Sequence, residues 1–125
     1  MSFCLIILAG GNSHRFGSKI GKPYQKLAGK SLIEIIVSKA RQFKQIKKIV
    51  LVYNKKDAKR VKTLKLKNMK LIIGGSNRQQ STFNALRYLI NNKGTSKVLI
   101  HDAARPNFSK KLLGLILKNM RNARA

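Results

Sequence analysis

The sequence predicts an α/β fold built on a mainly parallel β-sheet. Four short apolar runs are spaced along the 125 residues, and stretches with the periodicity of amphipathic helices separate them. Strands that alternate with helices form parallel sheets with right-handed crossover connections. Ligands bind such sheets beyond the carboxyl ends of the strands, so the segments that follow the strands are the first places to look for function. The expected strands are residues 5–8, 49–53, 71–73 and 98–100.

The loop after the first strand has the composition of a phosphate-binding turn. Ala9, Gly10 and Gly11 carry almost no side-chain bulk, which lets backbone N–H groups approach a phosphate closely. Arg15 and Lys22 follow, and these two cations could hold a polyphosphate. The loop is not of the Walker type, since the chain has no G-x-x-x-x-G-K-[ST] motif. The alternative interpretation is an ordinary strand-to-helix turn with solvated cations.

A capping box marks the first expected helix. Ser31 and Glu34 have the spacing at which a serine caps the helix and a glutamate reaches back to the cap. We expect the helix to run to about Phe43. Its predicted inner face is Leu32, Ile35, Ile36, Ala40 and Phe43.

Two glycines and a polar segment follow the third strand. Gly75 closes the strand, and Arg78 and Ser81 lead into a helix. Ser81 is the predicted N-cap of that helix, and the helix start is a candidate for holding a nucleotide. These two roles are compatible. The predicted inner face is Phe83, Leu86, Leu89 and Ile90.

The few acidic residues single out Asp102. Glu34 and Asp57 each lie three residues into an expected helix, where a local structural role is sufficient. Asp102 instead ends a buried strand beside the proposed phosphate loop, and a carboxylate there suits a magnesium ion that bridges to nucleotide phosphates. The alternative is a turn-forming aspartate that caps local backbone. Arg105 lies at the same edge and is a candidate anion contact.

The net charge of +25 arises from 28 Lys and Arg residues against three acids. It is compatible with nucleic-acid binding, with attraction of anionic small molecules, or with a lysine-rich composition that has no specific partner. We rank nucleic acid below the other two, because no basic run reaches five or six residues and the aromatic content is 6%. A single cysteine excludes a disulfide framework. No signal peptide or membrane span is apparent, so we expect a cytoplasmic protein.

Three motifs together resemble a known enzyme family. Residues 8–17 (LAGGNSHRFG) are similar to the start of sugar-phosphate nucleotidyltransferases. Residues 74–81 (GGSNRQQS) and 101–106 (HDAARP) resemble the 2-C-methyl-D-erythritol 4-phosphate cytidylyltransferases of non-mevalonate isoprenoid synthesis. The resemblance implies a three-layer, Rossmann-like nucleotide-diphospho-sugar transferase fold. It also implies transfer of CMP from CTP to methylerythritol phosphate, with pyrophosphate released and Mg²⁺ or another divalent cation as cofactor.

The resemblance carries roles onto matching positions of this chain. Arg15 and Lys22 would be catalytic and would stabilise charge on the phosphates. Asp102 would approach both the metal and the acceptor, with Arg105 nearby. The residues that would bind the nucleotide are Ala9, Gly10, Gly11, Gly75, Arg78 and Ser81.

Some features depart from the family pattern. Gly21-Lys22-Pro23 stands where the family has Pro-Lys-Gln, so Lys26 is an alternative to Lys22. Ser13 stands where the family has a glycine. With this serine the loop is also similar to that of guanylyltransferases of molybdenum-cofactor maturation, although the HDAARP motif argues against them. Cytidylyltransferases for ribitol phosphate are closer rivals.

The family domain is nearly twice as long as this chain. We therefore expect residues 1–125 to be the N-terminal, CTP-binding portion of one domain, with an exposed apolar edge at the last strand. The other half would supply acceptor-binding residues and the contacts of a homodimer.

Overall fold

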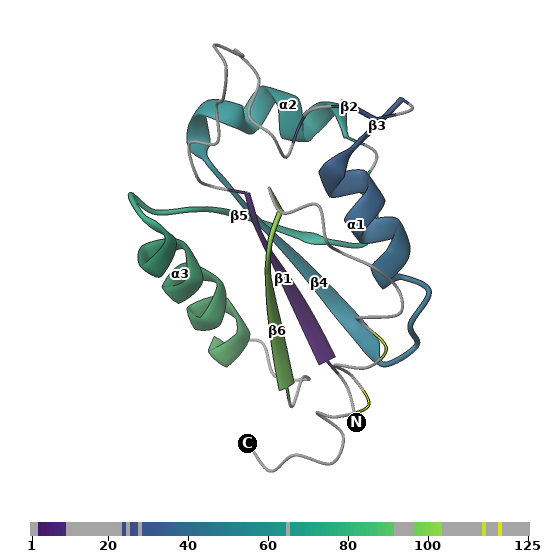
Figure 1. Cartoon of the computed structure of the whole chain (residues 1–125). Helices are drawn as coiled ribbons and strands as arrows, with labels where there is room; N and C mark the ends of the chain where they lie inside the picture. The colour runs from purple at the N-terminus through teal and green to yellow at the C-terminus, as the bar shows by residue number, and fades with distance from the viewer. Residues whose placement is uncertain are drawn as a thin grey trace.

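The structure is a computed structural model that describes residues 3–9, 24, 26–27, 29–64, 66–91, 97–103, 114 and 118. Its centre is a four-stranded parallel sheet with the order β5-β4-β1-β6 (Figure 1). This confirms the predicted α/β class, and each predicted strand lies within an observed one. The strands are β1 (Phe3–Ala9), β4 (Ile46–Tyr53), β5 (Lys70–Ile73) and β6 (Lys97–Asp102).

Strand β1 lies between β4 and β6, and all seven of its residues are buried. A parallel strand covered on both faces needs apolar side chains at every position, which explains the continuous apolar run in the sequence. Side chains of β1 point alternately to the two faces, so Leu5 and Ile7 belong to one core cluster and Cys4 and Ile6 to the other.

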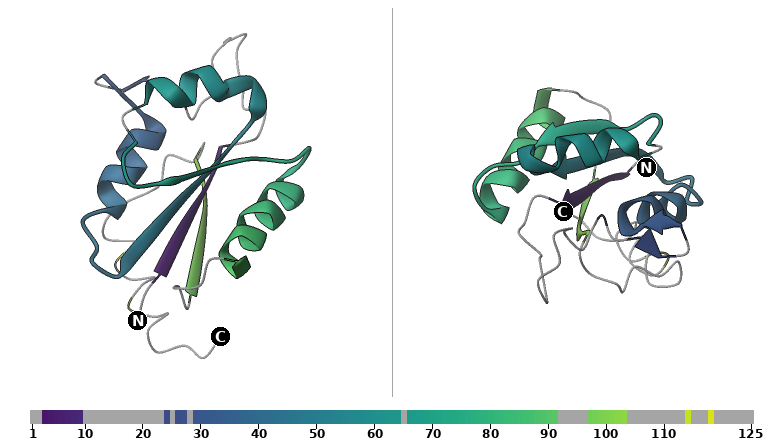
Figure 2. Two further views of the ribbon diagram at one scale, coloured as in Figure 1. Left: turned by 180° about the vertical axis from the view of Figure 1, so that it is seen from behind. Right: turned by 90° about the horizontal axis from the view of Figure 1, so that it is seen from above.

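Helices cover both faces of the sheet, so the fold has three layers: helix, sheet and helix (Figures 1 and 2). Helix α1 (Leu32–Ala40) lies on one face and helix α3 (Arg78–Asn91) on the other. The shorter elements are the hairpin of β2 (Lys26–Leu27) and β3 (Lys30–Ser31), the 3₁₀ turn η2 (Lys55–Asp57) and α2 (Ala58–Thr63).

The capping box of α1 is confirmed. The Glu34 backbone N–H donates to Ser31 Oγ at 3.1 Å, and the Ser31 N–H donates to Glu34 Oε1 at 3.1 Å. The predicted inner face of this helix was correct at Ile36 and Ala40, which are buried. It was wrong at Leu32 and Ile35, which are half-buried.

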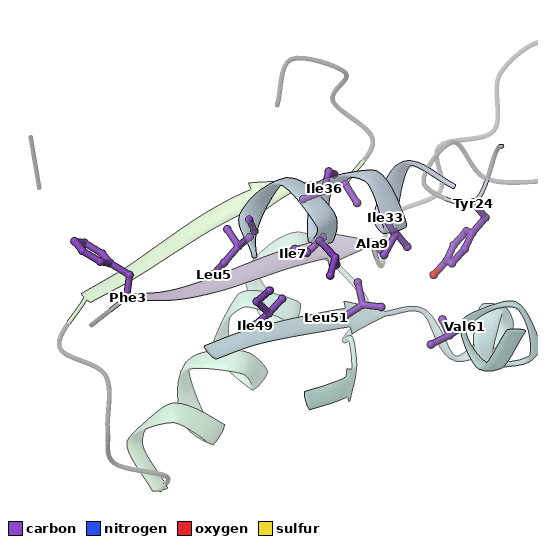
Figure 3. Packing of buried hydrophobic residues seen from close by; sticks show 13 residues of the cluster. Phe3, Leu5, Ile7, Ala9, Tyr24, Ile33, Ile36, Ile49, Leu51 and Val61 are labelled. Carbon is purple, nitrogen blue, oxygen red and sulfur yellow. The ribbon is translucent and has the colours of Figure 1, made fainter. Parts of the chain in front are cut away.

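The residues that α1 buries in their place are Ile33 and Val37. Apolar residues occupy more than one side of this helix, so the periodicity alone does not decide which side faces the sheet. The helix also ends at Ala40, before Phe43, which packs at the edge of the cluster. Figure 3 shows Ile33 and Ile36 on α1 beside the strand that carries Leu5 and Ile7, with which they share one core cluster.

The predicted inner face of α3 was largely wrong. Phe83, Leu86 and Ile90 are exposed, and Ile90 retains 76% of its surface. The buried positions of α3 are Ser81 and Ala85, with Tyr88 and Leu89 packed at the border of the core. Small side chains at the contact allow α3 to approach the sheet closely, which turns the larger apolar residues outward.

Apolar surface is also exposed at the last strand of the described sheet. Ile100 of β6 keeps 42% of its surface, on the face of the sheet that α3 flanks. This agrees with the expected apolar surface at that edge. The sequence from Ser109 onward also has the pattern of a capped amphipathic helix, and this segment lies outside the described residues, apart from Gly114 and Lys118.

Candidate functional site

The predicted site residues divide into two groups. Those that the structure describes are Ala9, Gly75, Arg78, Ser81 and Asp102. Those that lie outside the described residues are Gly10, Gly11, Arg15, Lys22 and Arg105. Lys26, the alternative to Lys22, belongs to β2, and the structure does not describe its side chain.

The carboxyl ends of β1 and β6 lie side by side. Leu8 is in register with Asp102, and the backbone N–H of Ala103 donates to the Leu8 carbonyl at 2.9 Å. Ala9 and Ala103 are both buried, so the backbone at this edge is firmly held. Asp102 therefore lies next to the residue at which the predicted phosphate loop begins.

The turn after β5 is fastened to β4 and to α3. The Gly74 N–H donates to the Tyr53 carbonyl at 2.7 Å, and the Gly75 N–H donates to Ser81 Oγ at 3.1 Å. A Cβ atom at Gly74 would lie 2.6 Å from Ser81 Oγ, and one at Gly75 would overlap Gln80. The close approach of the helix thus requires glycine at both positions.

The predicted capping role of Ser81 was wrong. Helix α3 begins at Arg78, and Asn77 accepts from the Gln80 N–H through Oδ1 at 2.8 Å. Ser81 is instead buried one turn into the helix, where its hydroxyl supports the glycine turn. The spacing of Asn77 and Gln80 matches a capping-box signature and could have located this helix start from the sequence.

An ion pair joins α3 to β6. Arg78 Nε lies 3.1 Å from Asp102 Oδ1, with 63% of the Arg78 side chain and 26% of the Asp102 side chain exposed. These residues come from different motifs, 24 positions apart, and the sequence did not indicate that they pair. The pair places one cationic and one anionic side chain at the same solvent-reachable edge.

The other two acids are occupied by local structure. Glu34 closes the capping box of α1, and the buried Asp57 pairs with Arg60 at 3.2 Å. Among the described residues, no cluster of three or more His, Cys, Asp or Glu side chains could hold a metal ion. Asp102 is therefore the acid best placed for a cation, and a single carboxylate suits a magnesium ion that takes further oxygens from phosphates and water.

Tyr24 is a buried residue that the sequence did not single out for this edge. It packs in the same cluster as Ala9, at the end of the sheet where β1 ends (Figure 3). Burial and the nearby Asp57 carboxylate both raise the pKa of its phenol, so Tyr24 is neutral at physiological pH.

The family is decided by sequence comparison. A sequence model of the 2-C-methyl-D-erythritol 4-phosphate cytidylyltransferases (IspD) matches residues 3–125. The chain belongs to this family. Within the described part of the chain, no helix is both long enough and apolar enough to cross a membrane.

Similar proteins of the IspD family include both single and bifunctional enzymes. The bifunctional enzyme IspD/IspF of Pelagibacter ubique is 46% identical over 121 residues, which cover 97% of this chain and 32% of the relative. The 2-C-methyl-D-erythritol 4-phosphate cytidylyltransferase of Thermosipho melanesiensis is 38% identical over 120 residues, which cover 92% of this chain and 51% of the relative. The chain thus spans about half of the length of the second relative and about a third of the first.

Solved structures show the same fold. The 4-diphosphocytidyl-2C-methyl-D-erythritol synthase of Anaerococcus prevotii superposes with a TM-score of 0.80 at 27% identity, over 98% of this chain and 52% of that one. The bifunctional IspDF of Campylobacter jejuni gives 0.78 at 30% identity, over 96% of this chain and 31% of that one. The Rossmann-like nucleotidyltransferase fold predicted from the motifs is confirmed.

Proposed function

We propose that residues 1–125 form the CTP-binding portion of a cytidylyltransferase domain that transfers CMP from CTP to 2-C-methyl-D-erythritol 4-phosphate. The observation that carries this proposal is the family match over residues 3–125. It is supported by the carboxyl edge of the sheet, where Leu8, the residue before Ala9, is in register with Asp102, and where Arg78, three residues after Gly75, pairs with Asp102. The products would be 4-diphosphocytidyl-methylerythritol and pyrophosphate.

The proposed reaction is an in-line displacement at phosphorus. An oxygen of the acceptor phosphate attacks the α-phosphorus of CTP, the bond from that phosphorus to the oxygen bridging to the β-phosphate breaks, and pyrophosphate leaves with that oxygen. Such a reaction depends on positioning and on neutralisation of negative charge. In this proposal the N–H groups of residues 9–11 hold the phosphates, and Arg15 and Lys22 stabilise the charge that develops.

The segment after β5 would shape the cytidine side of the site. The Gly75 N–H already donates a hydrogen bond to Ser81 Oγ, so the Ser81 hydroxyl would act by holding the glycine turn in place. Asp102 would bind Mg²⁺ or another divalent cation, which supplies positive charge at the phosphates when bound. Arg105, four residues after His101 in the HDAARP motif, would contact the acceptor phosphate.

Nucleotide selectivity tests this proposal most directly. Calorimetric titration of the chain with CTP, GTP, ATP and UTP in Mg²⁺ should show a preference for CTP. The affinity of this chain alone should be low, because the relatives are longer. Asp102→Asn should weaken binding of the Mg²⁺–CTP complex, whereas Arg87→Gln, at an exposed position on α3, should not. Preference for GTP would favour a guanylyltransferase instead.

A second acceptor has a specific observation in its favour. The bifunctional ribulose 5-phosphate reductase/CDP-ribitol pyrophosphorylase Bcs1 of Haemophilus influenzae is 33% identical over 113 residues. Pyrophosphate release by the protein should therefore be compared between methylerythritol phosphate and ribitol 5-phosphate as acceptors. We expect the protein to be a cytoplasmic homodimer that prefers methylerythritol phosphate as the acceptor. Faster pyrophosphate release with ribitol 5-phosphate would make ribitol 5-phosphate the substrate instead.

A nucleic-acid-binding module is the candidate from a different class. Lys55, Lys56, Lys59 and Lys62 are exposed along η2 and α2, where a polyanion could contact them. We expect this binding to be weak and without sequence preference, since the enzyme proposal assigns those lysines no ligand. Gel shifts at rising salt separate the two classes, because specific binding that survives physiological salt would favour the module.

A further inference from the structure

The ion pair between Arg78 and Asp102 is a weak contact at the candidate site. It joins the first turn of α3 to the last residue of β6, with 3.1 Å between Nε and Oδ1. The guanidinium is largely exposed, so water competes for it. Exposed pairs of this kind change an equilibrium by only about two- to fivefold. Arg78 can therefore leave Asp102 readily when another partner is offered.

A divalent cation and the Arg78 guanidinium would compete for the same carboxylate. Both are positive, and two positive charges a few ångströms apart repel each other. A cation on Asp102 thus weakens the hold of the carboxylate on Arg78 and favours a position of Arg78 away from it. The exposed Arg78 side chain can move away without disturbing the core, which at this helix is formed by Ser81 and Ala85.

An arginine released at this edge has an anionic partner available if the site binds a nucleotide. Arg78 begins α3, three residues after Gly75, at the turn proposed to hold the nucleotide. Guanidinium groups bind phosphate oxygens through charge-assisted hydrogen bonds, and a planar fork can make two of them at once. The same side chain is thus suited first to the carboxylate and then to the ligand.

We propose that Arg78 is a positioning residue that occupies the Asp102 carboxylate in the free protein and exchanges it for the nucleotide when nucleotide and divalent cation bind. This inference rests on the proposed function for the identity of the anion. The exchange couples the two ligands, since a cation on Asp102 frees Arg78 for the anion, and an anion on Arg78 frees Asp102 for the cation. The free protein therefore binds the cation alone, or the anion alone, more weakly than it binds either one in the presence of the other.

The test measures Mg²⁺ binding without any nucleotide. Amide spectra of the ¹⁵N-labelled chain are recorded during a Mg²⁺ titration at constant ionic strength. The Ala103 amide is the reporter, because its hydrogen bond to Leu8 holds it next to Asp102. Arg78→Gln should lower the apparent dissociation constant for Mg²⁺ about two- to fivefold, the change expected for one exposed ion pair.

Two further variants separate the pair from general charge effects. Arg87→Gln removes the same charge from an exposed position on the same helix and should leave the dissociation constant within about 1.5-fold of wild type, as expected of a distant surface charge. In the Asp102→Asn background, Arg78→Gln should have no effect, because the carboxylate that both cations seek is absent.

Two outcomes would overturn the exchange. One is that Arg78→Gln binds Mg²⁺ no more tightly than Arg87→Gln does. The other is that no variant shows a saturable shift at Ala103. The nucleotide titration is independent of this measurement. A chain that shows the exchange but prefers GTP would refute CTP as the substrate and leave the role of Arg78 intact.

Discussion

The two long helices are held to the sheet in different ways. Helix α1 buries Ile33, Ile36, Val37 and Ala40, whereas the buried positions of α3 are Ser81 and Ala85. A fully buried aliphatic side chain contributes about 1.5–3 kcal/mol, so α1 is fixed mainly by apolar contact. Helix α3 relies more on directed polar contacts at its amino-terminal half.

Those polar contacts connect α3 to the edge that carries the candidate site. Ser81 bonds to Gly75, Asn84 Nδ2 donates to the Ile73 carbonyl at 3.3 Å, and Arg78 pairs with Asp102. Hydrogen bonds fix direction as well as distance, so they position a turn more closely than apolar contact does. The comparison indicates that α1 serves as the scaffold, whereas α3 orients the binding edge.

The largest expected effect contrasts one isoleucine on each helix. Ile33→Ala should lower the free energy of unfolding by about 2–5 kcal/mol, since Ile33 is fully buried. Ile90→Ala should change it by less than about 0.5 kcal/mol, since 76% of Ile90 is exposed. Urea unfolding followed by far-ultraviolet circular dichroism measures both, because the chain has no tryptophan for fluorescence.

The milder change Ile33→Val covers the case in which Ile33→Ala does not fold, with an expected loss of about 0.5–1.5 kcal/mol. Equal losses for Ile33→Ala and Ile90→Ala would break the comparison. They would mean that the outer side of α3 is packed in solution, and sedimentation of the wild-type chain would then show self-association.

The two helices also differ in how well the sequence predicts them. For α1, the capping box located the start, because Ser31 and Glu34 satisfy each other locally. For α3, Phe83, Leu86 and Ile90 were assigned to the core but are exposed, and the contact is made by Ser81 and Ala85 with Tyr88 and Leu89 at its border. Hydrophobicity ranks side chains by size and apolar character. It does not detect that a small residue allows two elements to approach closely.

The site was predictable in part. The rule that ligands bind beyond the carboxyl ends of parallel strands brought Ala9 and Asp102 to one edge, and the strand register agrees. The ion pair of Arg78 with Asp102 depends on the distance between α3 and β6, which no local pattern encodes. The roles of Arg15 and Lys22 stay predictions, since these residues lie outside the described part of the chain.

Removing the Ser81 hydroxyl tests whether polar contacts orient the glycine turn. Ser81→Ala leaves the Gly75 N–H without its partner at 3.1 Å, and the expected loss is about 1–2 kcal/mol of unfolding free energy. Thr82→Ala is the matched control, since its more exposed hydroxyl donates to the Arg78 carbonyl within the helix, and we expect a change below about 0.5 kcal/mol. Similar losses in both variants would contradict the role assigned to Ser81.

The smallest expected effect concerns how completely water is excluded from the face of the sheet that α3 covers. Cys4 lies in the core cluster on that side, and burial raises the pKa of its thiol from 9.0 to about 11, against the opposing effect of the Lys48 charge. The folded state therefore favours the neutral thiol. The resulting stabilisation is complete below pH 9 and is lost as pH rises toward 11.

Comparison with Cys4→Ala isolates this term from the titration of the lysines. Between pH 7 and pH 10 the unfolding free energy of the wild type should fall by about 1 kcal/mol more than that of Cys4→Ala does. Below pH 8 the unfolding free energies of the two proteins should change with pH in the same way. Modification of Cys4 by a thiol reagent at pH 8 should proceed no faster than global unfolding, because the thiol is fully buried. Rapid modification would show that the α3 side of the sheet opens without global unfolding, and the polar contacts at Gly75 and Asp102 would then be too weak to fix the binding edge.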